Sequence, residues 1–376
     1  MIKKIIYLLG IVAVLLGLYG FYTRLLIGER DVNYGSYVTW GLWVAMYLFF
    51  AGIATGAFML ATLDYLFNVK LFKGTGKYAL WAAMVTMPAA LITIGFDLGR
   101  MERIWKVYLS PNFGAPMAQL VWGYTIFTLV VIISLILAAL RPQSTLMKIL
   151  MSTGLFLAIF LSGGVGALLS VNASRAGWHN GMLPAQFPVF SLTSGVALMM
   201  IVIGWFTPES DTRGQRLHVL SLTMVVLILV KAYYLWTDFS LALYTGVPDA
   251  AKAVNLILFG QYSWAFWGLQ LFLGMIVPLI ILITPKPSRT GVWAGLMGLF
   301  ILIGFAVARS NIIFPALAIP ELEGLLTAFH GPHLNFDYAP SLMEWSVTIG
   351  VVGLSTLAFL IGTDRLSFLK KVEVSQ

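Results

Sequence analysis

Long apolar runs alternate with short polar segments along the whole chain. Each run approaches the twenty or so residues that a helix needs to cross a bilayer. The pattern predicts ten spans, at roughly 5–26, 38–67, 78–97, 118–140, 148–171, 188–206, 217–237, 262–284, 291–314 and 342–362. The first run follows Lys3 and Lys4 as a signal peptide would, but no small-residue cleavage site follows, so we expect a retained helix. The prediction is an all-α integral membrane protein.

Composition supports this class and excludes others. Hydrophobic residues make up 60% of the chain and charged residues 10%, and the mean hydropathy is +0.91. The chain has no cysteine, which excludes an iron–sulfur cluster or a thiolate metal site of its own. No polar segment is long enough for a soluble domain, so a catalytic domain has to come from another chain. The net charge of +8 does not indicate nucleic acid, because basic loops are usual in membrane proteins.

The loops differ in basic residues, and this predicts an orientation. With the N-terminus inside, fourteen Lys and Arg residues fall in inner segments and six or seven in outer ones. Cytoplasmic loops carry such an excess. We therefore expect a multi-pass protein of the cytoplasmic membrane with both termini inside and the segment from Asp97 to Lys106 outside.

A weak internal repeat divides the spans into two groups. The segment 49–59 in the second span echoes 190–199 in the sixth. This predicts two parallel four-helix bundles, 34–172 and 173–315. The helix in 1–30, and an outer loop, last helix and cytoplasmic tail in 316–376, are then additions. Gly52 and Gly56 form a small-residue face that predicts close helix packing.

The histidines do not fit a haem. A b-type haem needs axial histidines inside helices, and the four here lie in outer loops or at a span's inner mouth: His179, His218, His330 and His333. The pair in H-G-P-H could hold a metal, although two loop histidines are more often ordinary surface groups.

Four ionisable residues lie inside spans, where charge is costly and often functional: Asp64, Lys231, Arg309 and Glu344. One interpretation is structural ion pairing, with Asp97, Asp238 and Glu344 at the depth of the two cations. The other is a path that conducts protons from the cytoplasm toward the outer face.

One segment, from Ile94 to Tyr124, places charges at the end of an apolar run. Asp97, Arg100 and Arg103 follow Phe96 at once, with tryptophans interleaved, which is typical of a membrane boundary. A plain interfacial loop would explain the composition equally well. Its motifs, D-L-G-R-x-x-R-x-W and then S-P-N-x-x-x-P-M, resemble those of the NrfD/PsrC-type family, membrane subunits of polysulfide reductase and related respiratory complexes.

Three other segments resemble the same family: 40–56 (W-G-L-W…A-T-G), 175–195 (R-A-G-W-H-N…T-S-G) and 338–345 (Y-A-P-S-L-M-E-W). Two departures concern the pocket lining: Met101 stands where the family often has Pro, and Ala118-Gln119-Leu120 where it often has Ser-Trp-Gly.

A quinone site needs an apolar slot and one or two groups that bind the carbonyl oxygens and transfer protons. The candidates for proton transfer are Asp97 and Arg100. Candidates for the pocket wall at the outer face are Trp40, Trp43, Tyr47, Gln119, Trp122, Arg175, Trp178 and His179. Single aromatics at this depth are commonly interface anchors, so the grouping carries the prediction.

The resemblance implies a subunit that is not catalytic alone and has no redox centre. It implies that the chain exchanges electrons between menaquinone and a multi-cubane iron–sulfur subunit on the extracytoplasmic side, with further catalytic or cytochrome subunits, in anaerobic respiration of sulfur compounds. It also implies that a side chain at Tyr47 reaches the quinone. The alternatives are a proton-coupled secondary transporter and a passive membrane anchor.

Overall fold

The computed structural model describes residues 2–175, 177–207, 211–322, 324–329 and 331–370. All regular structure in these ranges is helical, and ten of the helices are long and apolar enough to cross a membrane. They are α1 (Ile2–Leu26), α2 (Leu42–Tyr65), α3 (Gly76–Asp97), α5 (Pro116–Leu140), α6 (Thr145–Ser170), α7 (Leu183–Phe206), α8 (Asp211–Tyr244), η3 (Ala265–Ile276) continued by α10 (Val277–Ile283), α12 (Gly291–Leu317) and α14 (Leu342–Arg365). The predicted all-α membrane fold is confirmed.

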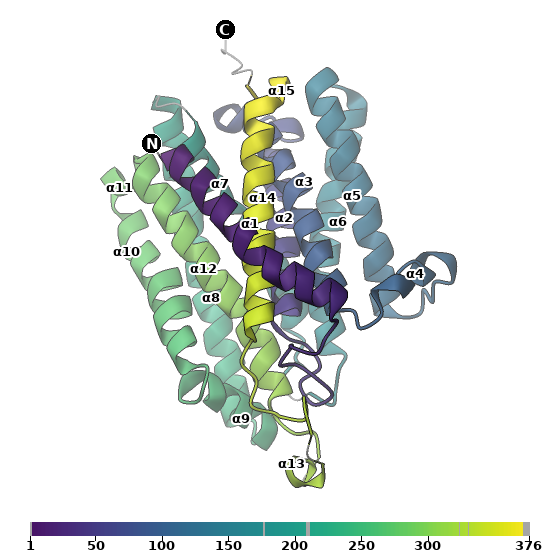
Figure 1. Cartoon of the computed structure of the whole chain (residues 1–376). Helices are drawn as coiled ribbons and strands as arrows, with labels where there is room; N and C mark the ends of the chain where they lie inside the picture. Colours follow the sequence, from purple (N-terminus) through teal and green to yellow (C-terminus); the bar gives the residue numbers. More distant parts are fainter. Residues whose placement is uncertain (1, 176, 208–210, 323, 330, 371–376) are drawn as a thin grey trace.

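Shorter helices lie between these spans and after the last one. They are η1 (Lys70–Phe72), η2 (Met101–Arg103), α4 (Lys106–Leu109), α9 (Pro248–Leu258), α11 (Pro285–Arg289), α13 (Leu325–Ala328) and α15 (Ser367–Lys370). The segment 98–115, which contains η2 and α4, projects sideways from the bundle, and we call it the arm (Figure 1). We call the end of the bundle where α3 ends and α14 begins the rim.

The central helix is α2. It is apolar on all sides, as a fully enclosed helix is. Of the residues in its most apolar stretch of 18, 94% are buried inside the protein. It packs against α3, α6, α7 and α12. A Cβ added at Gly56 would lie 1.8 Å from the Ser191 carbonyl oxygen, and one at Gly195 would lie 2.3 Å from Gly56. The close approach predicted from Gly52 and Gly56 is therefore confirmed, and α2 and α7 meet at equivalent positions of the repeat. The division into two separate four-helix bundles stays a prediction, because α2 and α7 each also contact helices of the other group.

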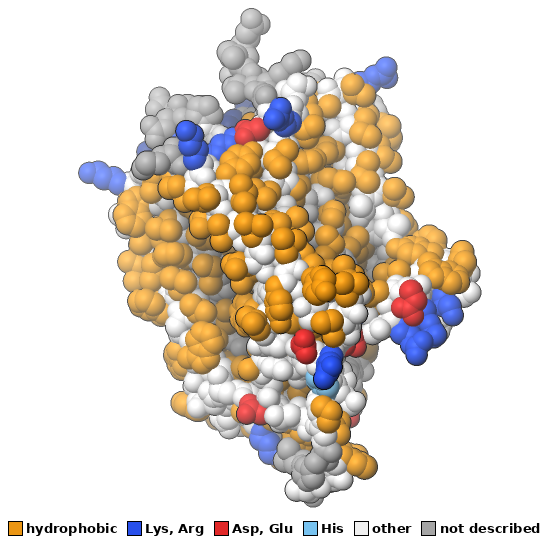
Figure 2. All heavy atoms as spheres, in the orientation of Figure 1, with side chains coloured by type: hydrophobic (Ala, Val, Ile, Leu, Met, Phe, Trp, Pro, Cys, Tyr) orange, Lys and Arg blue, Asp and Glu red, His pale blue; other side chains and the backbone are white. Residues whose placement is uncertain are grey.

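The outer surface is that of a membrane protein. Hydrophobic side chains cover the sides of the bundle, and charged side chains gather at its two ends and on the arm (Figure 2). The terminal helices α1 and α14 pack together on one side (Figure 1). Gly17 and Gly350 allow their contact, since a Cβ at Gly17 would lie 2.3 Å from the Gly350 Cα.

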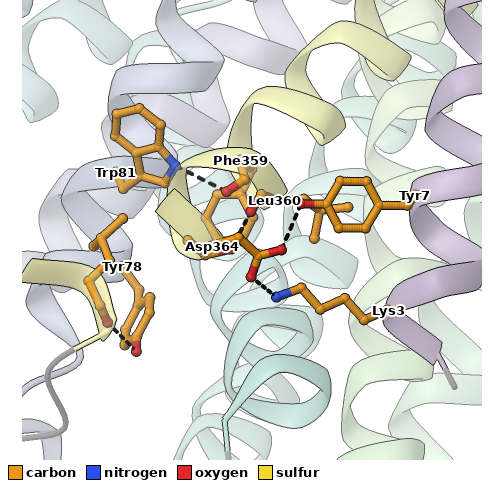
Figure 3. A network of polar contacts seen from close by, with 9 residues as sticks. Lys3, Tyr7, Tyr78, Trp81, Phe359, Leu360 and Asp364 are labelled. Carbon is orange, nitrogen blue, oxygen red and sulfur yellow. Dashed lines mark hydrogen bonds and ion pairs between the residues drawn. The ribbon is translucent and has the colours of Figure 1, made fainter. Parts of the chain in front are cut away.

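A polar network joins the helices at the end opposite the rim (Figure 3). Lys3 of α1 forms an ion pair with Asp364 of α14, and the Tyr7 hydroxyl donates to the same carboxylate at 2.8 Å. The Trp81 indole of α3 donates to the Phe359 carbonyl at 3.2 Å. The network therefore fixes α1 and α3 against the end of α14.

Candidate functional site

Asp97 is the last residue of α3, at the rim. Its Oδ1 is buried and finds no hydrogen-bond partner among the described residues. The charged groups that act on this carboxylate are Glu29, Glu344 and Arg24. Buried carboxylate oxygens are normally hydrogen-bonded, so this atom is available to a ligand or a proton.

Arg24 fixes the end of α3 from the neighbouring helix α1. It is 4% exposed, and it donates to the carbonyl oxygens of Phe96 at 2.7 Å and Leu98 at 2.8 Å. Its guanidinium also pairs with Glu29 at 3.0 Å. These carbonyls flank Asp97 in the sequence, so α1 holds the backbone on both sides of Asp97.

Aromatic side chains surround the rim. Trp43 is fully buried, and its indole donates to the Glu344 carbonyl at 3.2 Å. Tyr34 packs edge-on against Trp43, with ring centroids 5.9 Å apart. Burial raises the pKa of the Tyr34 phenol far above its usual value, and the negative charges of Asp97 and Glu29 add to this shift. The rim is thus a protected site with an excess of negative charge.

Glu344 is the buried carboxylate whose bonds are all used. Its side chain accepts from the backbone N–H groups of Asn33 at 3.1 Å, Leu42 at 3.3 Å and Ser341 at 2.9 Å, and from the Tyr338 hydroxyl. With Ser341 it forms a capping box at the start of α14. These bonds join α14, α2 and the chain segment before α2.

Three other predicted pocket residues lie where α2 meets its neighbours. Trp40 stacks on Trp178 with ring centroids 5.4 Å apart, and the Trp178 indole donates to the Ile312 carbonyl at 2.6 Å. Tyr47 packs edge-on against Tyr124 of α5 at 6.3 Å. The tryptophan pair bridges the two predicted groups of helices, whereas the tyrosine pair lies within the first.

Two predicted pocket residues hold the arm. Gln119 donates to the Phe113 carbonyl at 2.7 Å, and the Trp122 indole donates to the Val107 carbonyl at 3.3 Å. Arg100 is exposed at the base of the arm. Among the described residues, the structure brings Gln119 and Trp122 to the arm rather than to Asp97.

Arg175 and His179 lie on the segment before α7. Arg175 pairs with Glu321 at 2.8 Å and donates to the Ile319 carbonyl at 3.0 Å. Burial lowers the pKa of Arg175, and Glu321 opposes this shift. The His179 Nδ1 lies 2.9 Å from the Ser170 carbonyl oxygen, and His179 also lines a cavity of about 550 Å³ in the second group of helices.

The two cations inside the spans face aromatic rings. The Lys231 Nζ lies 3.6 Å from the Phe305 ring centroid, and the Arg309 guanidinium carbon lies 4.2 Å from that of Phe187. Within the described ranges neither cation forms an ion pair with a carboxylate, and Lys231 Nζ and Arg309 Nη1 lack hydrogen-bond partners. The ion pairs considered from the sequence are therefore not formed there.

A group of hydroxyls lies beside Arg309 where α2, α6 and α7 meet. Ser162 is 3.1 Å from the Thr55 hydroxyl and 3.0 Å from the Ser191 hydroxyl. A cavity of about 10 Å³, also lined by Tyr124, adjoins them. It is the size of one water. Sequence reasoning missed these hydroxyls, because small polar residues at helical spacing give no signal of which ones meet.

Asp64 lies at the other end of α3 from Asp97, roughly 30 Å away along the helix. It accepts from the backbone N–H groups of Gly74 and Gly76, each at 2.9 Å. It also lines a cavity of about 750 Å³ with Lys70, Lys73 and Lys77. Asp64 thus caps the start of α3 and borders a basic opening.

Among the described residues, no group of three or more His, Cys, Asp or Glu side chains that could hold a metal ion occurs. His218 lies 2.8 Å from the Ser288 hydroxyl, and His333 adopts a positive φ of 62°. His330, the other half of the H-G-P-H pair, lies outside the described residues.

Comparison with known proteins identifies the family. The family described as "Polysulphide reductase, NrfD" matches residues 32–321. The chain belongs to the NrfD family. The match spans α2 to α12, so α1 and α14, which supply Arg24 and Glu344 to the rim, lie outside it.

Several relatives match nearly the whole chain. One subunit of the selenate reductase of Mesobacillus selenatarsenatis is 29% identical over 100% of this chain and 97% of the relative. The Hdr-like menaquinol oxidoreductase integral membrane subunit of Archaeoglobus fulgidus is 25% identical over 95% of this chain and 92% of its own. The menaquinone reductase integral membrane subunit of Nitratidesulfovibrio vulgaris is 23% identical over 91% and 86%. The similarity of this NrfD protein to the selenate reductase subunit thus extends over α1 and α14.

Proposed function

We propose that this chain is the quinone-reactive membrane subunit of an anaerobic respiratory oxidoreductase. The proposal draws on relatives named as integral membrane subunits of a menaquinol oxidoreductase and a menaquinone reductase. In this proposal the rim faces the extracytoplasmic side of the membrane and both termini lie in the cytoplasm, as the basic loops predict. The terminal substrate belongs to the partner chains.

The observation that carries the proposal is the unpartnered Asp97 oxygen, buried at the rim beside aromatic side chains. Interconversion of a quinone and its quinol moves two electrons and two protons. Asp97 is proposed to exchange a proton with a quinone oxygen at this end of the bundle, with Trp43 and Tyr47 on the α2 side. Arg100, three residues further on, is proposed to assist at the same end.

The partner for electron transfer is proposed to be an iron–sulfur subunit, because this chain has no cysteine with which to hold a cluster. The arm offers it a surface of mixed character, with exposed Arg100, Trp105, Leu109 and Phe113. Aromatic and arginine side chains are enriched at protein interfaces. A partner bound there would lie next to Asp97.

Protons are proposed to enter at the opposite end, through the basic opening at Asp64. The hydroxyls of Thr55, Ser162 and Ser191, with Arg309 beside them, lie at intermediate depth and offer groups for a relay. Polar groups inside a membrane are costly and often mark proton pathways. The proposed route does not use Lys231, although its amine and the Arg309 guanidinium both lie over the Phe190 ring. It also does not use Glu344, whose carboxylate bonds are all made within the rim.

The test is Asp97→Asn in the purified complex, with Arg100→Ala beside it. We expect electron transfer from menadiol to the partner clusters to fall by roughly 10²-fold, the scale of a lost acid–base group. Transfer between reduced methyl viologen and the partner should be unchanged, because it bypasses the membrane subunit.

Glu102→Gln is the matched control, since it makes the same carboxylate-to-amide change at an exposed residue five positions away. Wild-type menadiol activity in both Asp97→Asn and Arg100→Ala would refute the site. Menadiol activity in neither wild type nor variants, with viologen activity intact, would instead indicate a passive anchor.

A further inference from the structure

The cavity of about 550 Å³ lies away from Asp97, among α7, α8, α9, η3 and α12. Most of its lining is apolar, and its volume falls within the range of pockets that bind small molecules. Residues of α8 at helical spacing form one wall, namely Lys231, Leu235, Asp238 and Ala242. The proposed function does not use this cavity.

Lys231 lies in the wall of the cavity and carries an unused donor. The side chain is 0% exposed, and Nζ has no hydrogen-bond acceptor within the described part of the chain. Nζ lies 3.6 Å from the Phe305 ring centroid and 6.0 Å from that of Phe190, and aromatic rings accept no hydrogen bond of ordinary strength. A buried donor without an acceptor is unfavourable, so the arrangement suits a ligand that brings an acceptor oxygen.

Asp238 supplies the opposite polarity two helical turns away, roughly 10 Å along α8. Its carboxylate accepts from Asn180 at 2.9 Å and Gln186 at 2.6 Å, which hold it in place. A second amide pair, in which Asn311 donates to the Gln270 oxygen at 2.8 Å, also lines the cavity. The pocket therefore offers donors and acceptors at separated positions on apolar walls.

A second, apolar groove adjoins this cavity. It has a volume of about 320 Å³ between α8 and η3, and it shares Leu235, Phe239 and Phe266 with the first cavity. Exposed Trp236 and Tyr244 border it on the face of α8 that looks outward from the bundle. The two spaces together match a molecule with a compact polar head and a long apolar tail.

We propose that this pair of cavities is a second binding site for an isoprenoid quinone, with the ring between Lys231 and Asp238 and the tail leaving between α8 and η3. The π-helical geometry of η3 places Phe266 and Gln270 on the ring cavity. Such geometry recurs at functional sites. A quinone carbonyl accepts from Lys231, and the quinol hydroxyl can donate to Asp238.

The polar groups favour a quinone over a phospholipid. A phosphate would be attracted by Lys231 but repelled by Asp238, and it would have to leave the membrane surface. The inference concerns binding alone, and it stands whether or not Asp97 serves the first site.

The first experiment is photolabelling of the whole complex, in nanodiscs free of native quinone, with a menaquinone analogue that carries an azide on its ring. We expect label on peptides of α8 and η3, competed by unlabelled menaquinone and unaffected by added phosphatidylglycerol. Competition by phosphatidylglycerol to the same extent as menaquinone would show a structural lipid only and overturn the proposal.

The second experiment uses variants. Lys231→Met keeps the length of the side chain and removes the donor, and Ala308→Phe places a ring in the cavity. Each should reduce the label on α8 and η3 at least five-fold. Lys252→Met, at an exposed lysine of α9 that pairs with Asp249, is the matched control and should label as wild type.

Asp97→Asn separates the two sites, because it should leave the α8 and η3 label unchanged even if it abolishes menadiol activity. Full labelling of α8 and η3 in correctly assembled Lys231→Met and Ala308→Phe complexes would overturn the second site without affecting the first.

Discussion

Glu344 at the rim and Lys231 in the second cavity are both fully buried ionisable residues, yet their surroundings are opposite. The Glu344 carboxylate accepts three backbone N–H groups and a tyrosine hydroxyl, whereas the Lys231 amine has no acceptor within the described ranges. A group whose bonds are all used holds the fold together. A group whose bonds are open is available to something outside the chain, so burial alone does not identify function.

Removing Glu344 is the strongest test of whether its hydrogen bonds stabilise the fold. Glu344→Ala leaves the Ser341 N–H and the Tyr338 hydroxyl without their acceptor, whereas the Leu42 N–H keeps the Tyr338 oxygen. Each group left without an acceptor costs about 1–3 kcal/mol. We expect the largest loss of stability of any variant proposed here, on the order of 2–6 kcal/mol. Thermal unfolding of the purified subunit in detergent, followed by tryptophan fluorescence, measures it.

Glu321→Ala is the control for Glu344→Ala, because its carboxylate is 41% exposed in its pair with Arg175. The midpoint temperature of thermal unfolding of Glu321→Ala should stay close to that of the wild type. Equal midpoints for Glu344→Ala and Glu321→Ala would show that the buried bonds of Glu344 do not hold the rim.

Asp97→Asn at the proposed quinone site comes next, with the loss of menadiol activity given above and little change in stability. Removal of a carboxylate with an unpartnered oxygen should cost the fold little. Comparing its unfolding midpoint with that of Glu344→Ala tests the distinction directly. A drop in midpoint as large as that of Glu344→Ala would place Asp97 among the structural residues.

Asp64→Asn should slow turnover of the complex in vesicles by roughly ten-fold at saturating quinol, through loss of a proton-exchanging group. The amide oxygen can still accept from Gly74 and Gly76, so the start of α3 should stay intact. Asp64→Glu is the matched variant that keeps the charge. Wild-type turnover and proton uptake in Asp64→Asn would exclude a path through this end.

Lys231→Met should leave the stability of quinone-free complex unchanged or raise it by about 1 kcal/mol. Replacing an unpaired buried polar group with an apolar one of similar length removes an unfavourable term. The midpoint of thermal unfolding in quinone-free detergent measures this. A fall of several degrees would mean that the contact with Phe305 stabilises the fold, and would weaken the contrast with Glu344.

Lys3→Ala should have the smallest effect, below about 1 kcal/mol, because the side chains of Lys3 and Asp364 are each 40% exposed. The Tyr7 hydroxyl can still donate to Asp364 (Figure 3). Thermal unfolding at low and at high salt checks it. A large effect that persists at high salt would contradict a solvent-screened pair.

The candidate site could be predicted in part. Asp97 could be chosen from the sequence because it ends an apolar run inside a recognisable motif. The partners that surround it could not, since Arg24 lies 72 residues from Phe96 along the chain and in a helix outside the family match. Gln119 and Trp122 were grouped with Asp97 because they share its depth, yet their contacts are to the arm. Depth limits which residues can meet, but it does not say which face of the bundle each one occupies.

The sequence by itself determined the class, the ten spans and the family of this protein. These depend on the hydropathy of consecutive residues and on short motifs, both of which are local. The tertiary structure alone decided that Glu344 joins three segments, that Lys231 faces Phe305 instead of a carboxylate, and that Asp238 and Gln270 border one cavity. Those contacts depend on how each helix is rotated and which helices it packs against. In an apolar solvent, rotation is set by small-residue packing such as Gly56 on Gly195, a preference that hydropathy does not record.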